Sequence, residues 1–344
     1  MIGGAHLVHS EKLALCRGFF CDVLALALLL LPAAASLRAQ TCLTAGDMDE
    51  ATKTALLNTA QSYFDSIARG DSAALRQNAI PSVASDFSGI ETAVKDNQSD
   101  LSGAKPVARP PFLLQAESNA PLERAEFLCG VFGSHGQTAD SRVFVIPNLP
   151  PGNYGFVTQD VSTAKGTYTV SYVLEQQATA WKLGGLYIKP SQVGGHDGNW
   201  FAASARELKA KGANHAAWFY YQEARDLLVP VSFMSTMATD KLYDESQTMK
   251  PADLAPADLA GNGKTFKLTA LFPLAVGTEL DLVAKYDTAS VANSAATYQD
   301  NLTVMKALLA KYPEFRNTFD GVIARAVEPS GRDYGTMLHM KDIK

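Results

Sequence analysis

Six short apolar segments follow one another between residues 112 and 188, and they constrain the fold more than any other feature. They run from Phe112 to Glu117, Arg124 to Phe132, Arg142 to Ile146, Gly155 to Gln159, Thr167 to Leu174 and Trp181 to Ile188. In the fifth, apolar residues alternate with threonine and serine, the period of a strand with one deeply buried face. Gly184 and Gly185 interrupt the sixth, as at a bulge or bend. These segments predict a strongly curved antiparallel sheet.

Helical patterns precede this sheet. Apolar residues recur at helical spacing from Asp49 to Ala68, Gly70 supplies a stop, and Asp71 starts a second short helix. A further helical piece is expected within residues 82–99, and the proline-rich segment 105–111 is expected to be an extended connector. Helices followed by a curved antiparallel sheet predict an α+β domain of about 150 residues.

This domain resembles a known family. The run from Ala60 to Leu75, which ends its helix in Gly-Asp, and the terminal strand from Trp181 to Ile188 are similar to the nuclear transport factor 2-like (SnoaL-like) cone fold, over about residues 48–190. The resemblance implies a sheet wrapped round a long helix, with a cavity at the wide end. The family includes enzymes, small-molecule binders and interaction modules, so the fold does not specify a function. The proline-rich connector and the loop 147–152 depart from the family pattern.

A helical pair follows the predicted cone. After a linker at 191–195, residues 200–211 and 213–228 have the spacing of two helices separated by Gly212, and they resemble a single tetratricopeptide unit. Because a solenoid needs about three such repeats to bury a continuous core, the pair is interpreted as an αα-hairpin packed on a neighbouring domain. Its Trp-Phe-Tyr-Tyr cluster at 218–221 has too many rings for one helix face, so some rings are expected to contact that domain or a partner.

The C-terminal part is predicted to be a small ββαββ unit that resembles no known family. Its expected elements are strands at 265–272 and 279–286, a helix that carries Leu302 to Tyr312, and strands at 322–327 and 336–340. Residues 250–263 are interpreted as a linker, because they contain two prolines and an Asn-Gly pair. The predicted organisation is a signal peptide (1–39), the cone-like α+β domain (40–190), the helical hairpin with its linker (191–263) and the C-terminal α+β unit (264–344).

The N-terminal segment has the order of a secretory signal peptide. Basic Lys12 and Arg17 precede an apolar run from Val23 to Leu31 and then small residues, with cleavage sites after Ala35 or Ala39. The run is shorter than the roughly 20 residues that span a bilayer, so cleavage and a periplasmic or extracellular location are expected. An uncleaved, membrane-anchoring signal is the alternative, and it would favour a surface-anchored assembly subunit.

Signal removal leaves only two cysteines. Cys16 and Cys21 depart with the peptide, and Cys42 and Cys129 remain in an oxidising compartment, where we expect them to pair. The alternative is that Cys129, in an apolar sequence context, is a buried free thiol.

Composition and motifs exclude several functions. The net charge is −5, and the sequence has no run of basic residues that could follow a phosphate backbone, which argues against nucleic acid as a partner. The spacings Ser102 to Lys105 and Ser162 to Lys165 lie beside glycines, without the helix start that serine-lysine catalysis needs. The histidines outside the signal peptide have no metal-ligand spacing, so neither metal nor cofactor is predicted. These histidines are His135, His196, His215 and His339, interpreted as loop, edge or core residues.

If the cone contains a working cavity, aromatic residues of the long helix and the sheet are expected to line it. These candidates are Tyr63, Phe64, Tyr168, Tyr172 and Trp181. The same rings are also ordinary core residues in a cone without a cavity. Asp86, Glu117 and Glu126 are candidate general bases if burial raises the pKa of their carboxyl groups.

The sequence therefore favours a secreted or periplasmic non-enzymatic binding or scaffold protein, with no residue assigned a catalytic role. Its expected partner is a small apolar ligand or another envelope protein, with no stable membrane span after processing. The alternative is an enzyme that performs acid-base chemistry in the cone cavity on a small apolar substrate. An open pocket with a carboxylate would favour the enzyme, and a cavity filled by leucine and tyrosine would argue against it.

Overall fold

The computed structural model describes residues 40–131 and 136–344, and it confirms a mixed α+β chain. The predicted signal peptide, Cys16 and Cys21, and His135 lie outside the described residues. Among the residues described, no helix combines the length and the apolar character needed to cross a membrane.

The predicted N-terminal helices are present. Helix α2 (Glu50–Ala68) begins after Asp49, whose side chain accepts the Thr52 N–H, and helix α3 (Ser72–Gln77) begins after Asp71, which accepts the Ala74 N–H. Gly70 separates them with a φ of 71°, a conformation that glycine adopts without strain. The helical piece expected within 82–99 forms two helices, α4 (Pro81–Ser85) and α5 (Ser88–Leu101).

All six predicted strands form, but they belong to two sheets rather than one. The larger sheet contains four of them, β3 (Phe112–Ala116), β6 (Gly152–Thr163), β7 (Gly166–Gln177) and β8 (Ala180–Pro190). Strand β1 (Gln40–Leu43) extends this sheet beside β3, and β2 (Pro106–Ala108), inside the expected connector, pairs with β6. The remaining two, β4 (Leu122–Cys129) and β5 (Arg142–Leu149), form a second sheet with β11 (Met234–Ser235).

The glycine pair in β8 forms the predicted bulge. Opposite β7, Val173 pairs with Gly185 and Leu174 pairs with Leu183, so Gly184 is the extra residue of the bulged strand. This extra residue changes which residues of β8 point to the core, so Leu183 remains fully buried.

The predicted disulfide is confirmed and links strands of the two sheets. Cys42 lies on β1 and Cys129 ends β4, with 5.1 Å between their Cα atoms and a sequence separation of 87 residues. The alternative of a buried free thiol at Cys129 is therefore wrong.

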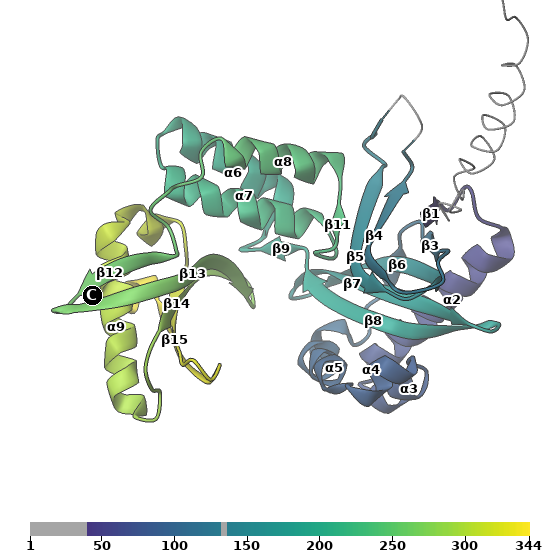
Figure 1. The fold of residues 1–344 in the computed structure, drawn as a ribbon, viewed down its shortest axis with the longest axis horizontal. Coiled ribbons are helices and arrows are strands. Elements are labelled where there is room, and N and C mark those ends of the chain that lie inside the picture. Colours follow the sequence, from purple (N-terminus) through teal and green to yellow (C-terminus); the bar gives the residue numbers. More distant parts are fainter. Residues whose placement is uncertain (1–39, 132–135) are drawn as a thin grey trace, which may run out of the picture. The chain divides into compact units, whose positions relative to one another are not determined.

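The helical pair is also present, with a third helix that the sequence pattern did not predict. Helices α6 (Gly198–Ala210) and α7 (Asn214–Leu228) lie side by side, and α8 (Met237–Gln247) packs on α7 (Figure 1). A short ribbon of β9 (Gln192–Val193) and β10 (His196–Asp197) precedes α6.

The C-terminal sheet has five strands, one more than expected. Its order is β12 (Ala257–Gly261), β13 (Lys264–Val276), β14 (Glu279–Asp287), β15 (Gly321–Val327) and β16 (Asp333–His339). The prediction that 250–263 is only a linker is wrong for its last residues, because Asn262 and Gly263 form a hairpin turn that returns β12 onto β13. Helix α9 (Ser294–Lys311) crosses one face of this sheet and lets β15 pair in parallel with β14 (Figure 1). A short 3₁₀ turn follows α9 at Pro313–Asn317, and another follows β16 at Met340–Asp342.

Hydrophobic packing joins the helical pair to the C-terminal sheet. One core contains Phe201 and Ala205 of α6, Phe219 of α7, the inner side of the C-terminal sheet and the buried side of α9. Phe219 contacts Phe315 and Phe319 edge to face, with ring centroids 5.6 and 5.7 Å apart. This confirms that rings of the 218–221 cluster pack on the neighbouring unit.

Candidate functional site

Three of the five predicted cavity residues are buried in the N-terminal core. Tyr63 and Phe64 of α2 and Tyr172 of β7 are 6%, 1% and 0% exposed, and the Tyr63 and Tyr172 ring centroids lie 6.3 Å apart. The Tyr172 hydroxyl donates to Gln159, and the Tyr63 hydroxyl donates to the backbone carbonyls of Asn78 and Trp181. Burial raises the pKa of Tyr63 to about 12, so the hydroxyl stays a hydrogen-bond donor.

The other two candidates lie at the edge of this core. Trp181 is partly buried against it, and the Tyr168 hydroxyl donates to Asp100 at 2.9 Å. Tyr168 also borders a pocket of about 360 Å³ that is lined mainly by polar groups, including Arg109 and Asp160. Arg109 donates to both carboxylate oxygens of Asp160, and the carboxylate of Asp197, which also lines this small pocket, accepts the Trp200 N–H. A ligand role for these aromatic residues stays a prediction.

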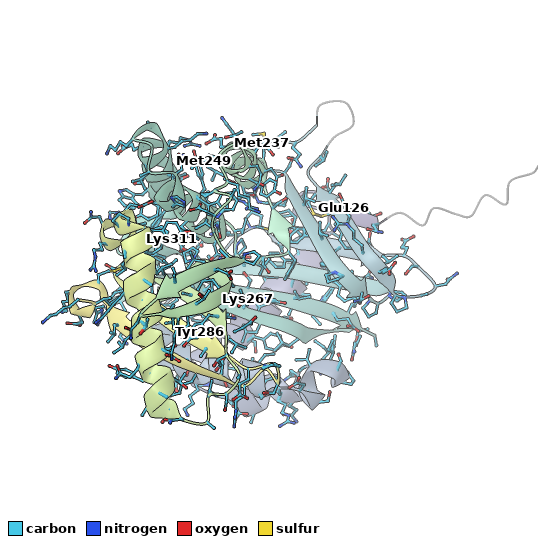
Figure 2. All side chains as sticks on the ribbon, turned by 60° about the vertical axis from the view of Figure 1, so that its left-hand side comes forward. Glu126, Met237, Met249, Lys267, Tyr286 and Lys311 are labelled. Atoms are coloured by element: carbon cyan, nitrogen blue, oxygen red, sulfur yellow. A yellow bond between two sulfur atoms is a disulfide. The ribbon has the colours of Figure 1, made fainter. Side chains whose placement is uncertain are left out.

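The acids proposed from the sequence are all at the surface. Asp86, Glu117 and Glu126 are exposed, and Figure 2 shows Glu126 on the β4–β5 side of the molecule. None of them lines either of the two pockets described here. Their exposure differs from the burial on which the prediction of a general base depended.

A larger pocket, of about 1120 Å³ and with a mainly apolar lining, lies elsewhere. Strand β8, the connection between α7 and α8, and strand β13 contribute most of its walls. Its apolar lining includes Val145, Leu186, Ile188, Val231, Phe233 and Leu274. Tyr187 and Leu274 are 41% and 43% exposed, so large apolar surfaces at the pocket have no protein covering them. We call this opening the β8–β13 pocket.

Two carboxyl groups, those of Glu223 and Asp226, line this pocket. Glu223 of α7 is only 4% exposed, and it makes no hydrogen bond or ion pair with any other described residue. Burial, followed by the nearby negative charge of Asp226, raises the pKa of Glu223 to about 7, against an opposing effect of Lys189. The group therefore changes charge near neutral pH.

The other charged groups at the pocket have contacts of their own, but the Arg225 Nε atom is buried without a hydrogen-bond partner among the described residues. Lys189 of β8 forms a 2.7 Å ion pair with Asp226 of α7 and also donates to the Val229 carbonyl. The Arg225 guanidinium lies 4.7 Å from the centroid of the Tyr243 ring, a cation–π contact. Glu223 is thus the lining carboxyl group that lacks a direct partner within the described chain.

Sequence reasoning missed Glu223 because an acid within a helix is ordinarily solvated. The available signal was its position, since it falls at i+3 from Tyr220 and four residues before Leu227, on the apolar stripe of α7. An acid at a core position of such a stripe indicates either a buried partner or a polar ligand.

Lysine and histidine residues of the other sequence motifs contact nearby acids or aromatic rings. Lys165 lies in the β6–β7 turn and pairs with Asp100, as expected for a turn residue, and His196 stacks on Trp200 with 3.7 Å between ring centroids. His215 was expected only to be an edge or core residue. In the structure its two ring nitrogens contact Glu314 and Asp253 at 3.0 and 2.8 Å. Across residues 40–131 and 136–344, no group of three or more histidine, cysteine or acidic side chains is arranged to hold a metal ion.

Comparison with family models, with curated proteins and with solved structures gave no match for this chain. The cone-like and tetratricopeptide-like resemblances therefore stay predictions.

Proposed function

We propose that this protein is a binding protein that takes a small, mainly apolar ligand in the β8–β13 pocket. The observation that carries the proposal is the pocket itself, about 1120 Å³ with an apolar lining and a single unpartnered carboxyl group. Ligand sites in proteins are typically concave, about 300–1,000 Å³ in volume, and apolar with a few convergent polar groups.

The proposal places this binding protein outside the cytoplasm. The Cys42–Cys129 disulfide supports an oxidising compartment, in agreement with the predicted signal peptide. We also propose that the N-terminal domain is a nuclear transport factor 2-like cone, supported by the order of helices and then long antiparallel strands. In this proposal, its interior is a structural core, and the ligand site is on the outside of the domain.

A fluorescence experiment tests ligand binding. The uncharged probe N-phenylnaphthylamine is expected to bind the wild-type protein with increased emission, because it moves from water to an apolar environment. Leu274→Glu places a charge on the pocket wall and is expected to weaken binding by about tenfold or more, since an unpaired charge in an apolar site costs over 1.4 kcal/mol.

Val276→Glu is the matched control. Val276 lies two residues along β13, is 38% exposed and does not line the pocket. Its replacement is expected to leave probe affinity unchanged. Equal affinity in both variants, or no binding to the wild type, would contradict the proposed site.

An enzyme acting in the same pocket is the second candidate, and the raised pKa of Glu223 favours it. A carboxyl group with a pKa of about 7 is suited to general acid-base catalysis at neutral pH. The test is to incubate mixed apolar esters, amides and ketones with wild type and with Glu223→Gln and to analyse the recovered compounds by mass spectrometry. A product formed by the wild type alone supports the enzyme, and unchanged compounds support binding without chemistry.

A further inference from the structure

The carboxyl group of Glu223 has the position of a ligand-binding group rather than that of a structural one. It lines the β8–β13 pocket, its residue is 4% exposed, and no described residue donates a hydrogen bond to it. A buried carboxyl group normally acquires donors from its own chain, because leaving it unsatisfied is costly. A donor supplied by a bound molecule would remove that cost.

The neighbouring cations do not supply the donor. Lys189 is held by Asp226 at 2.7 Å and by the Val229 carbonyl, and Arg225 is placed over the Tyr243 ring. Asp226 adds a second negative charge on the same helix, three residues after Glu223. Lys189 neutralises that charge, so the Glu223 carboxylate is the acceptor that remains open to a cationic donor. The Arg225 Nε atom, buried without a hydrogen-bond partner among the described residues, remains open to an acceptor.

Resting on the proposed function of this pocket, we propose that it selects apolar molecules that carry an ammonium group, whose N–H donates to the Glu223 carboxylate. The apolar part of the ligand contacts the lining that Leu186, Ile188 and Phe233 provide. A neutral alcohol of the same length would make one uncharged hydrogen bond, and a carboxylate would be repelled. Hydrogen bonds between charged groups are about twice as strong as neutral ones.

Three ligands of equal chain length test this selection: dodecylamine, dodecanol and dodecanoate, used below their micelle-forming concentrations to displace N-phenylnaphthylamine. At about pH 8.5 the amine is protonated and Glu223 is ionised. The amine is expected to displace the probe at a concentration about tenfold lower than the alcohol, and dodecanoate is expected to be the weakest.

Glu223→Gln is expected to abolish the preference for the amine over the alcohol, because the amide carries no charge to pair with the ammonium group. Glu207→Gln, which removes the same charge from an exposed position on α6, is the control and is expected to retain the preference. A pH series on the wild type gives an independent measurement, since protonation of Glu223 below about pH 6 is expected to remove the advantage of the amine.

The outcomes separate the two proposals. Equal displacement by amine and alcohol in the wild type would overturn the selection for ammonium groups while the ligand pocket stands. Retention of the preference in Glu223→Gln would overturn the role of this carboxylate. Failure of all three ligands and of the probe to bind would overturn the proposed function itself.

Discussion

Asp281 and Gly321 lie directly opposite each other where β14 and β15 pair in parallel, and the carboxylate occupies the space that a side chain at 321 would need. A Cβ built on Gly321 would lie 2.7 Å from the Asp281 Oδ1 atom and 2.7 Å from the Leu338 carbonyl oxygen. Asp281 is fully buried, and neither of its carboxyl oxygens has a hydrogen-bond partner among the described residues.

We therefore expect Gly321→Ala to lower the free energy of unfolding by about 2 kcal/mol or more, because the strand backbone at Leu338 cannot move away without breaking its pairing with Val322. Urea unfolding followed by circular dichroism measures the loss. Gly335→Ala in the same sheet is the control, since its nearest atom would be 3.9 Å away. A similar loss in both variants would contradict the steric explanation.

Asp281→Asn is expected to stabilise the protein at neutral pH. Burial, followed by the negative charges of Glu279 and Asp320, raises the pKa of Asp281 above 3.8, and His339 acts in the opposite direction. The folded state therefore binds the proton more strongly than the unfolded state, and ionisation destabilises the fold as the pH rises from about 3.8 through the folded pKa.

Asparagine cannot ionise, so its advantage over aspartate is expected to grow across this pH range to about 1–2 kcal/mol. Thermal unfolding of both proteins between pH 4 and pH 8 measures the difference. Asp320→Ala is the contrasting variant, because the Asp320 carboxylate accepts the Leu280 N–H and the loss of this acceptor is expected to destabilise the protein. A constant difference between wild type and Asp281→Asn at every pH would refute the ionisation argument.

Removal of the Cys42–Cys129 disulfide is expected to lower stability by about 4–5 kcal/mol in the chain-entropy model, because the bridge spans 87 residues. The double variant Cys42→Ser, Cys129→Ser tests this in guanidinium unfolding without reductant. Wild type treated with a reductant is the matched control and is expected to show the same loss. A loss below about 1 kcal/mol in both would indicate that the unfolded chain is little constrained by the bridge.

His215 is expected to stabilise the contact between the start of α7 and the turn after α9. The imidazole ring lies between two carboxylates, with Nε2 2.8 Å from Asp253 and Nδ1 3.0 Å from Glu314. His215→Phe keeps a ring that can pack beside Tyr312, whose centroid is 4.7 Å away, and removes both hydrogen bonds. The expected loss is about 1 kcal/mol, since Asp253 is half exposed to solvent.

The pH dependence of this loss is also defined. The hydrogen bond from His215, opposed by burial, lowers the pKa of Asp253 below 3.8, so the stabilising contribution is present above about pH 3.8 and disappears as the pH falls through the lower folded pKa. The difference in melting temperature between wild type and His215→Phe is therefore expected to shrink in acid. An unchanged difference at low pH would show that packing, rather than the charged contact, is what the variant removes.

Local patterns in the sequence predicted most of the elements. Alternation of faces indicated the strands, Asp49 and Asp71 indicated helix starts, and the paired glycines indicated the bulge at Gly184. Each of these signals depends on a few neighbouring residues, as backbone geometry does. The disulfide was also predictable, because removal of the predicted signal peptide would leave Cys42 and Cys129 as the only possible pair.

The sequence by itself therefore determined most of the helices, most of the strands, and the cysteine pair. Only the tertiary structure decided that the six strands divide between two sheets and that residues 257–261 join the C-terminal sheet. It also decided that Glu223 and Asp281 are buried with no hydrogen-bond partner among the described residues. The physical reason is the separation along the sequence of the residues that interact. A strand or helix pattern depends on neighbouring residues in the sequence. Strand partners and the burial of a carboxyl group depend instead on segments far apart in the chain, and a local pattern does not show which of these segments come into contact.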